Sequence, residues 1–287
     1  MRGYVLKKRA ENILTIVLIS LVLPCALTLL LSGRMEEIYR TIKNEADYIT
    51  VKTNSGTLEL DLEEYVIGVT ASQIPFGYDI EAIKAQMVIA RTNLYRQLRE
   101  SGESKEQKFV TMTELERAGA SEKFLRAQKE TNGKILTWED EPIMASFHAV
   151  STGKTRDGND TFLKENYPYL VSRVCPADET MPDAKQTIQI DDSWADLKIL
   201  EKDRAGYVLQ IETDEGVMSG EEFRILLGLP SSAFEIMKTE NDVFLEIFGI
   251  GHGIGMSQYT AQQMALANKD YIDILTYFFK DVQVTQK

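Results

Sequence analysis

Two histidines are the side chains of this sequence best suited to move a proton near neutral pH. They are His148, in the segment FHAVSTGKT, and His252, in the segment IGHGIGMSQ, and the sequence contains no others. A histidine can carry or release a proton at physiological pH, although a single one often has only a structural role. Glycines at positions 249, 251, 253 and 255 surround His252 and permit positive φ angles. They would let a bulky polymer approach the backbone, and a tight structural turn would use the same residues.

A zinc site and a phosphate-binding loop are the two cofactor sites that these segments suggest. His148, Cys175 and His252 are good zinc ligands, but the region around His148 has no cysteine and no second histidine. STGKT (151–155) resembles the end of a phosphate-binding loop, yet His148 occupies the place of its first glycine. We therefore predict no metal and no cofactor, and we expect Cys175 to be an inert thiol in a loop.

An uncharged segment near the N-terminus predicts a membrane anchor. Residues 13–32 carry no charge over twenty positions, which is enough for one helix across a bilayer. Basic residues dominate the tail at 1–12, so the N-terminus should be cytoplasmic and residues 33–287 extracytoplasmic. A cleaved signal peptide is the alternative, but the apolar segment is longer than such a peptide needs and no convincing cleavage site follows. We expect a single-pass protein of the cell membrane, with residues 33–47 as a membrane-proximal linker.

The net charge argues against two classes of partner, and the cysteine content argues against a disulfide. Asp and Glu number 44 against 32 Lys and Arg, a net charge of −12, which argues against nucleic acid or anionic lipid as a partner. Cys25 lies in the predicted anchor, and Cys175 is the only other cysteine. No disulfide can therefore form within the extracytoplasmic part, which must rely on its hydrophobic core.

Residues 48–287 have the pattern of one large α+β domain of mixed helices and antiparallel hairpins. Alternating apolar residues around Asn54-Ser55-Gly56 predict a hairpin over 48–62, and a second hairpin is expected over 134–148, turning near 139–142. Apolar residues at helical spacing predict a buried stripe on a helix that begins near Asp79. The stripe consists of Ile83, Met87, Ala90, Leu94 and Leu98.

The remaining segments divide into helices, strands and one long loop. Helical character is expected over 113–129, 258–268 and 271–280, the last capped by Asp270, and Ser219 with Glu222 forms a capping box for a helix ending near Gly228. Strands are expected at 186–190, 207–213, 234–238 and 243–248. Residues 151–185 should form a long loop, and loops of that length are usually functional or disordered.

Six segments, in order along the chain, resemble one known family. They are LEEYVIGV (62–69), ASQIP (71–75), EAIKAQMVIART (81–92), FHAVSTGKT (147–155), SGEEFRILLGLPSSAFEI (219–236) and IGHGIGMSQYTAQQMA (250–265). Together they are similar to the motifs of the stage II sporulation protein D family, which includes the amidase enhancers. Ala149 stands where the family usually has serine, and Thr260 stands where glycine is common.

The resemblance implies a protein that acts on bacterial peptidoglycan during sporulation, at forespore engulfment, together with a peptidoglycan amidase or endopeptidase. The family's chemistry is lytic transglycosylation of peptide-stripped glycan strands. One glutamic acid protonates the glycosidic oxygen and then accepts the proton of the sugar's 6-hydroxyl. That glutamate falls at Gln73 in this chain, and an amide cannot release a proton near neutral pH.

The substitution at Gln73 leaves two hypotheses open. In the first, the chain is a lytic transglycosylase in which another group supplies the proton, with His148 or His252, or one of the carboxyls of Glu63, Glu64, Asp79 and Glu81, as candidates. In the second, it binds glycan strands without cutting them and recruits or activates an amidase. Residues expected to contact the glycan in either case are Lys84, Arg91, Lys154, Thr155, Gly251, Gly253, Ser257 and Gln258. Ser257 is also expected to cap the helix that follows it.

Overall fold

The computed structural model describes residues 48–53, 56–101, 107–161, 167–191, 194, 196–240 and 242–287. The predicted tail, anchor and linker (residues 1–47) lie outside these ranges. Among the described helices, none has both the length and the apolar character needed to cross a membrane. Helices are interspersed with mostly antiparallel strands, which confirms the α+β class for this part of the chain. The predicted first hairpin is confirmed as a two-stranded sheet of β1 (Tyr48–Thr53) and β2 (Gly56–Asp61).

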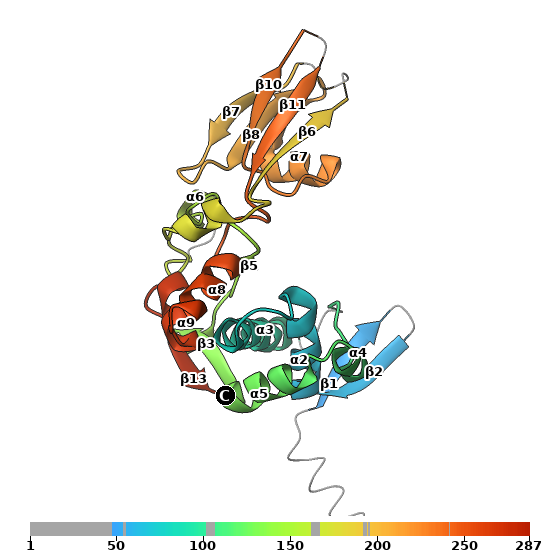
Figure 1. Cartoon of the computed structure of the whole chain (residues 1–287), viewed down its shortest axis with the longest axis vertical. Coiled ribbons are helices and arrows are strands. Elements are labelled where there is room, and N and C mark those ends of the chain that lie inside the picture. Colours follow the sequence, from blue (N-terminus) through green and yellow to red (C-terminus); the bar gives the residue numbers. More distant parts are fainter. Residues whose placement is uncertain are drawn as a thin grey trace, which may run out of the picture. The chain divides into compact units, whose positions relative to one another are not determined.

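Helix α3 (Ile80–Ser101) is the central element of the helical region (Figure 1). Asp79 accepts a hydrogen bond from the backbone N–H of Glu81 at 2.9 Å, which confirms where the helix begins. The predicted stripe is buried as far as Leu94, whereas Leu98 is partly exposed. Every residue from Ala82 to Thr92 is buried, because α3 packs against α5 (Ser121–Thr131), α8 (Gln258–Leu266), α9 (Tyr271–Phe278) and β3 (Lys134–Trp138).

The helices at 62–73 and 112–131 differ from those that the sequence pattern predicts. Helix α2 (Leu62–Gln73) precedes α3 and was not predicted. The helical character expected over 113–129 is two helices, α4 (Met112–Arg117) and α5, because Gly119 between them adopts a φ of 67°.

The hairpin predicted over 134–148 is only partly correct. Strand β3 does turn at Glu139 and Asp140, both at positive φ, and pairs with β4 (Glu141–Pro142). Its other neighbour is β13 (Gln283–Gln286), a pairing that joins residues far apart in the sequence. His148 lies outside this hairpin, in β5 (Phe147–His148), which pairs in parallel with β12 (Met256–Ser257).

Residues 185–248 form a β-rich region (Figure 1). This region has a hydrophobic core cluster of its own residues. One sheet has the order β10 (Phe234–Lys238), β11 (Val243–Phe248), β6 (Lys185–Ile190), and the other has the order β7 (Lys198–Lys202), β8 (Val208–Thr213), β9 (Gly216–Ser219). Helix α7 (Gly220–Leu227) starts at the predicted capping box and ends at Gly228. The four predicted strands are confirmed, and β7 and β9 are additional.

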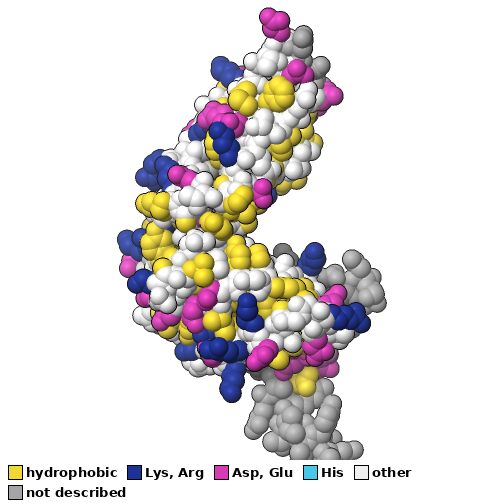
Figure 2. Space-filling view, in the orientation of Figure 1, with side chains coloured by type: hydrophobic (Ala, Val, Ile, Leu, Met, Phe, Trp, Pro, Cys, Tyr) yellow, Lys and Arg dark blue, Asp and Glu magenta, His cyan; other side chains and the backbone are white. Residues whose placement is uncertain are grey.

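The segment 151–185 is mainly irregular where it is described. It contains α6 (Gly158–Thr161) and the short 3-10 helix η1 (Pro176–Thr180). The predicted caps that follow it are confirmed, because Ser257 begins α8 and Asp270 begins α9. Acidic and basic side chains are interspersed on the face of the molecule in view (Figure 2).

Candidate functional site

The parallel pairing of β5 with β12 brings both histidine segments to the start of α8. His148 lies in register with Ser257, the N-cap of α8, whose hydroxyl accepts the N–H of Thr260 at 3.2 Å. The next residue, Gln258, is buried and donates from Nε2 to the backbone carbonyl of Gln73 at 2.8 Å. The end of α2, strand β5 and the start of α8 therefore meet at one place.

Three glutamine side chains form a hydrogen-bonded chain at this meeting point. Gln258 Nε2 also donates to Gln86 Oε1 at 3.1 Å, and Gln86 Nε2 donates to Gln73 Oε1 at 2.9 Å. Gln86 is fully buried on α3, whereas Gln73 is partly exposed at the end of α2. The remaining contact of the Gln73 side chain runs from Nε2 to Gln107 Oε1 at 3.5 Å. Among the described residues, each side chain that is hydrogen-bonded to the Gln73 carboxamide is thus an amide without a titratable proton.

The two histidines are close to each other and electrically neutral at physiological pH. Their ring centroids lie 6.0 Å apart. His148 is buried, and its Nδ1 must donate to the carbonyl of Ile254 at 3.1 Å, since a carbonyl only accepts. His252 has the opposite tautomer, because its Nδ1 accepts the N–H of Ile254 at 3.1 Å.

Burial sets the protonation state of both rings. It lowers the pKa of His148 to about 3, with a smaller contribution from the nearby His252. It also lowers the pKa of His252, although Glu221 opposes that shift. Neither ring therefore carries a proton to donate as an imidazolium near pH 7.

The glycine segment around His252 is shaped by close packing. Gly251 has a φ of 106°, and a Cβ there would lie 2.8 Å from His148 Cβ. Gly253 has a φ of 76°, and a Cβ there would overlap the ring of Tyr207. These glycines allow the two histidine segments and the β-rich region to approach one another, which supports the structural-turn interpretation of the segment.

A buried carboxylate, Asp178, ties the same segments together and was not singled out from the sequence. Its Oδ2 accepts the backbone N–H of Ser151 at 2.7 Å and the hydroxyl of Ser151 at 2.5 Å. Its Oδ1 accepts the hydroxyls of Ser257 at 2.9 Å and Thr260 at 2.7 Å. Four donors satisfy the oxygens of this fully buried side chain. In a single sequence, nothing distinguishes this aspartate from the other acids of the segment 151–185.

The two basic residues predicted on α3 are bound internally. Arg91 is completely buried, forms a two-pronged ion pair with Glu63 at 2.6 and 2.7 Å, and donates to the carbonyl of Lys134 at 3.1 Å. Lys84 is also buried and forms ion pairs with Glu81 and Glu130. In these positions both side chains stabilise the packing around α3 and leave little donor surface for a sugar.

The predicted site residues of the segment 151–155 are divided between surface and interior. Lys154 is exposed. Thr155 is buried, and its hydroxyl accepts the N–H of Arg173 at 2.8 Å. Cys175 is fully buried as well, and burial raises the pKa of its thiol to about 12. Within the described residues, no group of three or more His, Cys, Asp or Glu side chains is placed to hold a metal ion.

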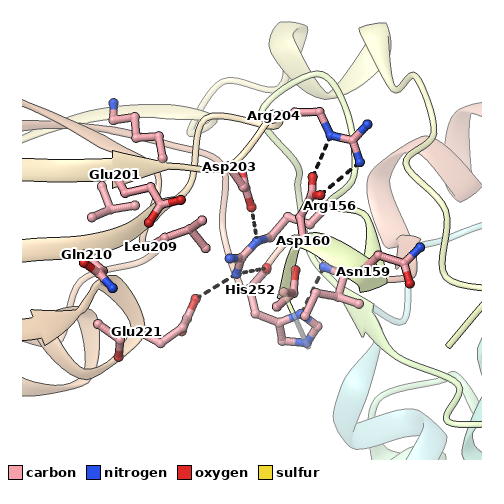
Figure 3. Close-up of a pocket in the computed structure, with 16 residues that line it drawn as sticks. Arg156, Asn159, Asp160, Glu201, Asp203, Arg204, Leu209, Gln210, Glu221 and His252 are labelled. Atoms are coloured by element: carbon pink, nitrogen blue, oxygen red, sulfur yellow. Dashed lines mark hydrogen bonds and ion pairs between the residues drawn. The ribbon is translucent and has the colours of Figure 1, made fainter. Parts of the chain in front are cut away.

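A cavity of about 780 Å³ adjoins His252 on the side of the β-rich region. The guanidinium of Arg156 lies between Asp203 and Glu221 on its wall (Figure 3), with Nε 2.6 Å from Asp203 Oδ2. Its Nη1 donates to the carbonyl of His252 at 3.3 Å. Gln73 does not line this cavity, so the cavity and the glutamine chain are separate features.

Comparison with known proteins identifies the family of this chain. The family model described as "Stage II sporulation protein" matches residues 52–138. The chain is 31% identical to the stage II sporulation protein D of Bacillus subtilis (strain 168), over 81% of this chain and 77% of that protein. The chain belongs to the stage II sporulation protein D family. The same-named protein of Bacillus amyloliquefaciens is 30% identical over 82% of this chain and 77% of its own length. An amidase enhancer of Bacillus subtilis is 21% identical over 76% of this chain and 40% of its own length.

Gln73 is the position at which the resemblance to the stage II sporulation protein D family places a catalytic glutamate. Three of the four carboxyls considered as replacements make other contacts here, and the fourth, Glu64, is exposed on α2. Glu63 and Glu81 form ion pairs with Arg91 and Lys84, and Asp79 caps α3. None of these three carboxyls is hydrogen-bonded to the Gln73 side chain.

Proposed function

We propose that this protein binds peptide-stripped glycan strands of peptidoglycan at the Gln73 site without cleaving them. In this proposal it acts during sporulation as an enhancer of a partner peptidoglycan amidase or endopeptidase. The observation that carries the proposal is the glutamine chain itself, in which Gln73, Gln86 and Gln258 are held by hydrogen bonds. A carboxamide can hydrogen-bond a glycosidic oxygen or an acetamide group, but it cannot transfer a proton.

Lytic transglycosylation is the second candidate function, and family membership supports it. It requires a general acid, and the loss of such a group typically lowers a rate by about 10²–10⁴. The two histidines are poor replacements because burial lowers the pKa of both. The cleavage hypothesis therefore needs a proton donor other than these two rings.

We further propose that residues 13–32 anchor the protein in the cell membrane and that the domain after residue 47 faces the wall. The uncharged length of this segment and the basic tail before it support this arrangement. A wall-facing domain would place the site at its glycan ligand.

The test compares cleavage with binding in one preparation. Sacculi treated with an amidase are incubated with the purified full-length protein and with its Gln73→Glu and Gln73→Ala variants. Anhydro-muropeptides are measured in the soluble fraction, and bound protein is measured in the pellet. Gln283→Glu adds the same charge at an exposed position of β13 and serves as the matched control.

We expect binding by the native protein, no anhydro product from it, and product only from Gln73→Glu. Anhydro product from the native protein that disappears in Gln73→Ala would overturn the binding-only proposal in favour of lytic transglycosylation. An absence of both binding and product for the native protein would exclude both candidate functions.

A further inference from the structure

We propose that Gln86 and Gln258 act as positioning residues that hold the Gln73 carboxamide with its N–H side toward the ligand. The ligand group that this arrangement selects is a hydrogen-bond acceptor, and the N-acetyl carbonyl of a glycan is an acceptor of that kind. Gln73 would then permanently present the donor that a protonated glutamic acid presents at that position. This inference rests on the glycan-binding function proposed above.

The orientation of the three glutamine side chains follows from the backbone carbonyl of Gln73, which can only accept a hydrogen bond. The backbone carbonyl of Gln73 can only accept, so the side-chain atom of Gln258 that lies 2.8 Å from it must be the amide nitrogen. That nitrogen also donates to the Gln86 side chain at 3.1 Å, so the atom that it meets must be Oε1. The nitrogen of Gln86 consequently faces residue 73.

The hydrogen bond from Gln86 to Gln73 then determines which way the Gln73 carboxamide is turned. Gln86 Nε2 is a donor and lies 2.9 Å from the Gln73 side chain, so the Gln73 atom that it meets must be the acceptor, Oε1. Burial of Gln86 and Gln258 makes a reversal costly, because a donor facing a donor leaves buried amide groups unsatisfied. Among the described residues, the Gln73 nitrogen then has only the 3.5 Å contact to Gln107. A partly exposed N–H with one long contact is available to a ligand acceptor.

A glutamate in the same place would behave differently in its two protonation states. One of its oxygens would accept from Gln86, and the other would take the position of the Gln73 nitrogen. An ionised carboxylate would offer an acceptor there, and only the protonated acid would offer a donor. The glutamine therefore fixes the hydrogen-bonding pattern of the acid form while removing its transferable proton.

An isosteric reversal of Gln86 is the sharpest test. In Gln86→Glu, measured at a pH where residue 86 is ionised, the carboxylate can only accept, so Gln73 must turn its nitrogen inward and its oxygen outward. We expect binding of amidase-treated glycan strands by the full-length protein to weaken by about tenfold or more, since an acceptor then faces an acceptor. Gln263→Glu, on a partly exposed position of α8, adds the same charge and should bind like the native protein.

Two further measurements keep the test decisive if Gln86→Glu does not fold. Gln86→Met removes the hydrogen bonds without adding charge and should weaken binding by a few-fold, because Gln73 becomes free to rotate. In the native protein, the side-chain amide signals of Gln73 should shift in NMR spectra when glycan is added. Unchanged binding in both Gln86 variants, or unshifted Gln73 signals in a protein that binds glycan, would overturn the positioning role alone. A native protein that does not bind glycan would instead remove the proposed function.

Discussion

The lowered pKa of His148 should make the free energy of unfolding depend on pH. The pKa of His148 is about 3 in the folded protein because of burial, whereas an unfolded histidine titrates near 6.5. Below pH 6.5 the unfolded chain binds a proton that the folded chain excludes. The free energy of unfolding should therefore fall as the pH drops from about 6.5 toward 3, by up to about 1.4 kcal/mol per pH unit from this residue.

His148→Asn should reduce that pH dependence. The asparagine amide can still donate to the carbonyl of Ile254, as Nδ1 does now. Urea unfolding of both proteins between pH 7 and pH 4.5 measures the two slopes. The variant slope should be smaller by about one proton, and a residual slope is expected because burial also lowers the pKa of His252. Equal slopes would mean that His148 is protonated in the folded protein.

Arg91 provides a second prediction at the residue scale. Removing one partner of a buried ion pair leaves the other charge uncompensated, which typically costs about 3–5 kcal/mol. Arg91→Ala should therefore lower the free energy of unfolding by about that amount, since Glu63 loses its cationic partner and keeps only the donor of Gln128. The double variant Arg91→Met with Glu63→Gln should recover part of the loss. A stable Arg91→Ala protein with impaired glycan binding would instead indicate direct contact with the sugar.

At the scale of elements, local patterns could be predicted and long-range pairings could not. The start of α3 at Asp79 and the caps at Ser219, Ser257 and Asp270 follow from nearby residues, and all are confirmed. The two-residue strands β5 and β12 have no periodicity of their own, and their pairing joins residues 147–148 with 256–257. The position of Gln73 was predicted from the family motifs. Its partners Gln86 and Gln258 lie on two other helices, so only the fold reveals the amide chain.

The glycine segment allows a prediction about how closely two elements approach. Gly255 and Gly228 have similar φ angles, 73° and 64°. A Cβ at Gly255 would overlap the carbonyl oxygen of Ser146, whereas a Cβ at Gly228 would meet nothing within 4 Å. Alanine at either position should pay the cost of a left-handed backbone, about 1–2 kcal/mol. Gly255→Ala should lose clearly more stability than Gly228→Ala in the same denaturation experiment. Equal losses would show that Ser146 can move away without cost.

At the scale of the whole molecule, the described chain is held together without a covalent cross-link. Its one cysteine in the described ranges, Cys175, is free and buried. The β-rich region has a separate hydrophobic cluster that includes Phe223, Phe234 and Leu245. A domain of this size can be stabilised by burial alone, without a disulfide.

The orientation proposed for the chain can be tested on intact cells. Alkaline phosphatase is active only outside the cytoplasm. If residues 13–32 anchor the protein with its basic tail inside, a phosphatase fused after Lys287 should therefore be active. External protease should then digest the domain while an N-terminal tag stays protected.

Introducing Lys at Leu21 and Leu27 should release the protein from the membrane fraction, because each central lysine opposes insertion by about 2.5–3.5 kcal/mol. Replacing the same leucines with Ile should leave it there. An inactive phosphatase fusion on a membrane-bound protein would mean that the site cannot reach the wall, and a glycan ligand would then be excluded by location, whatever Gln73 can bind.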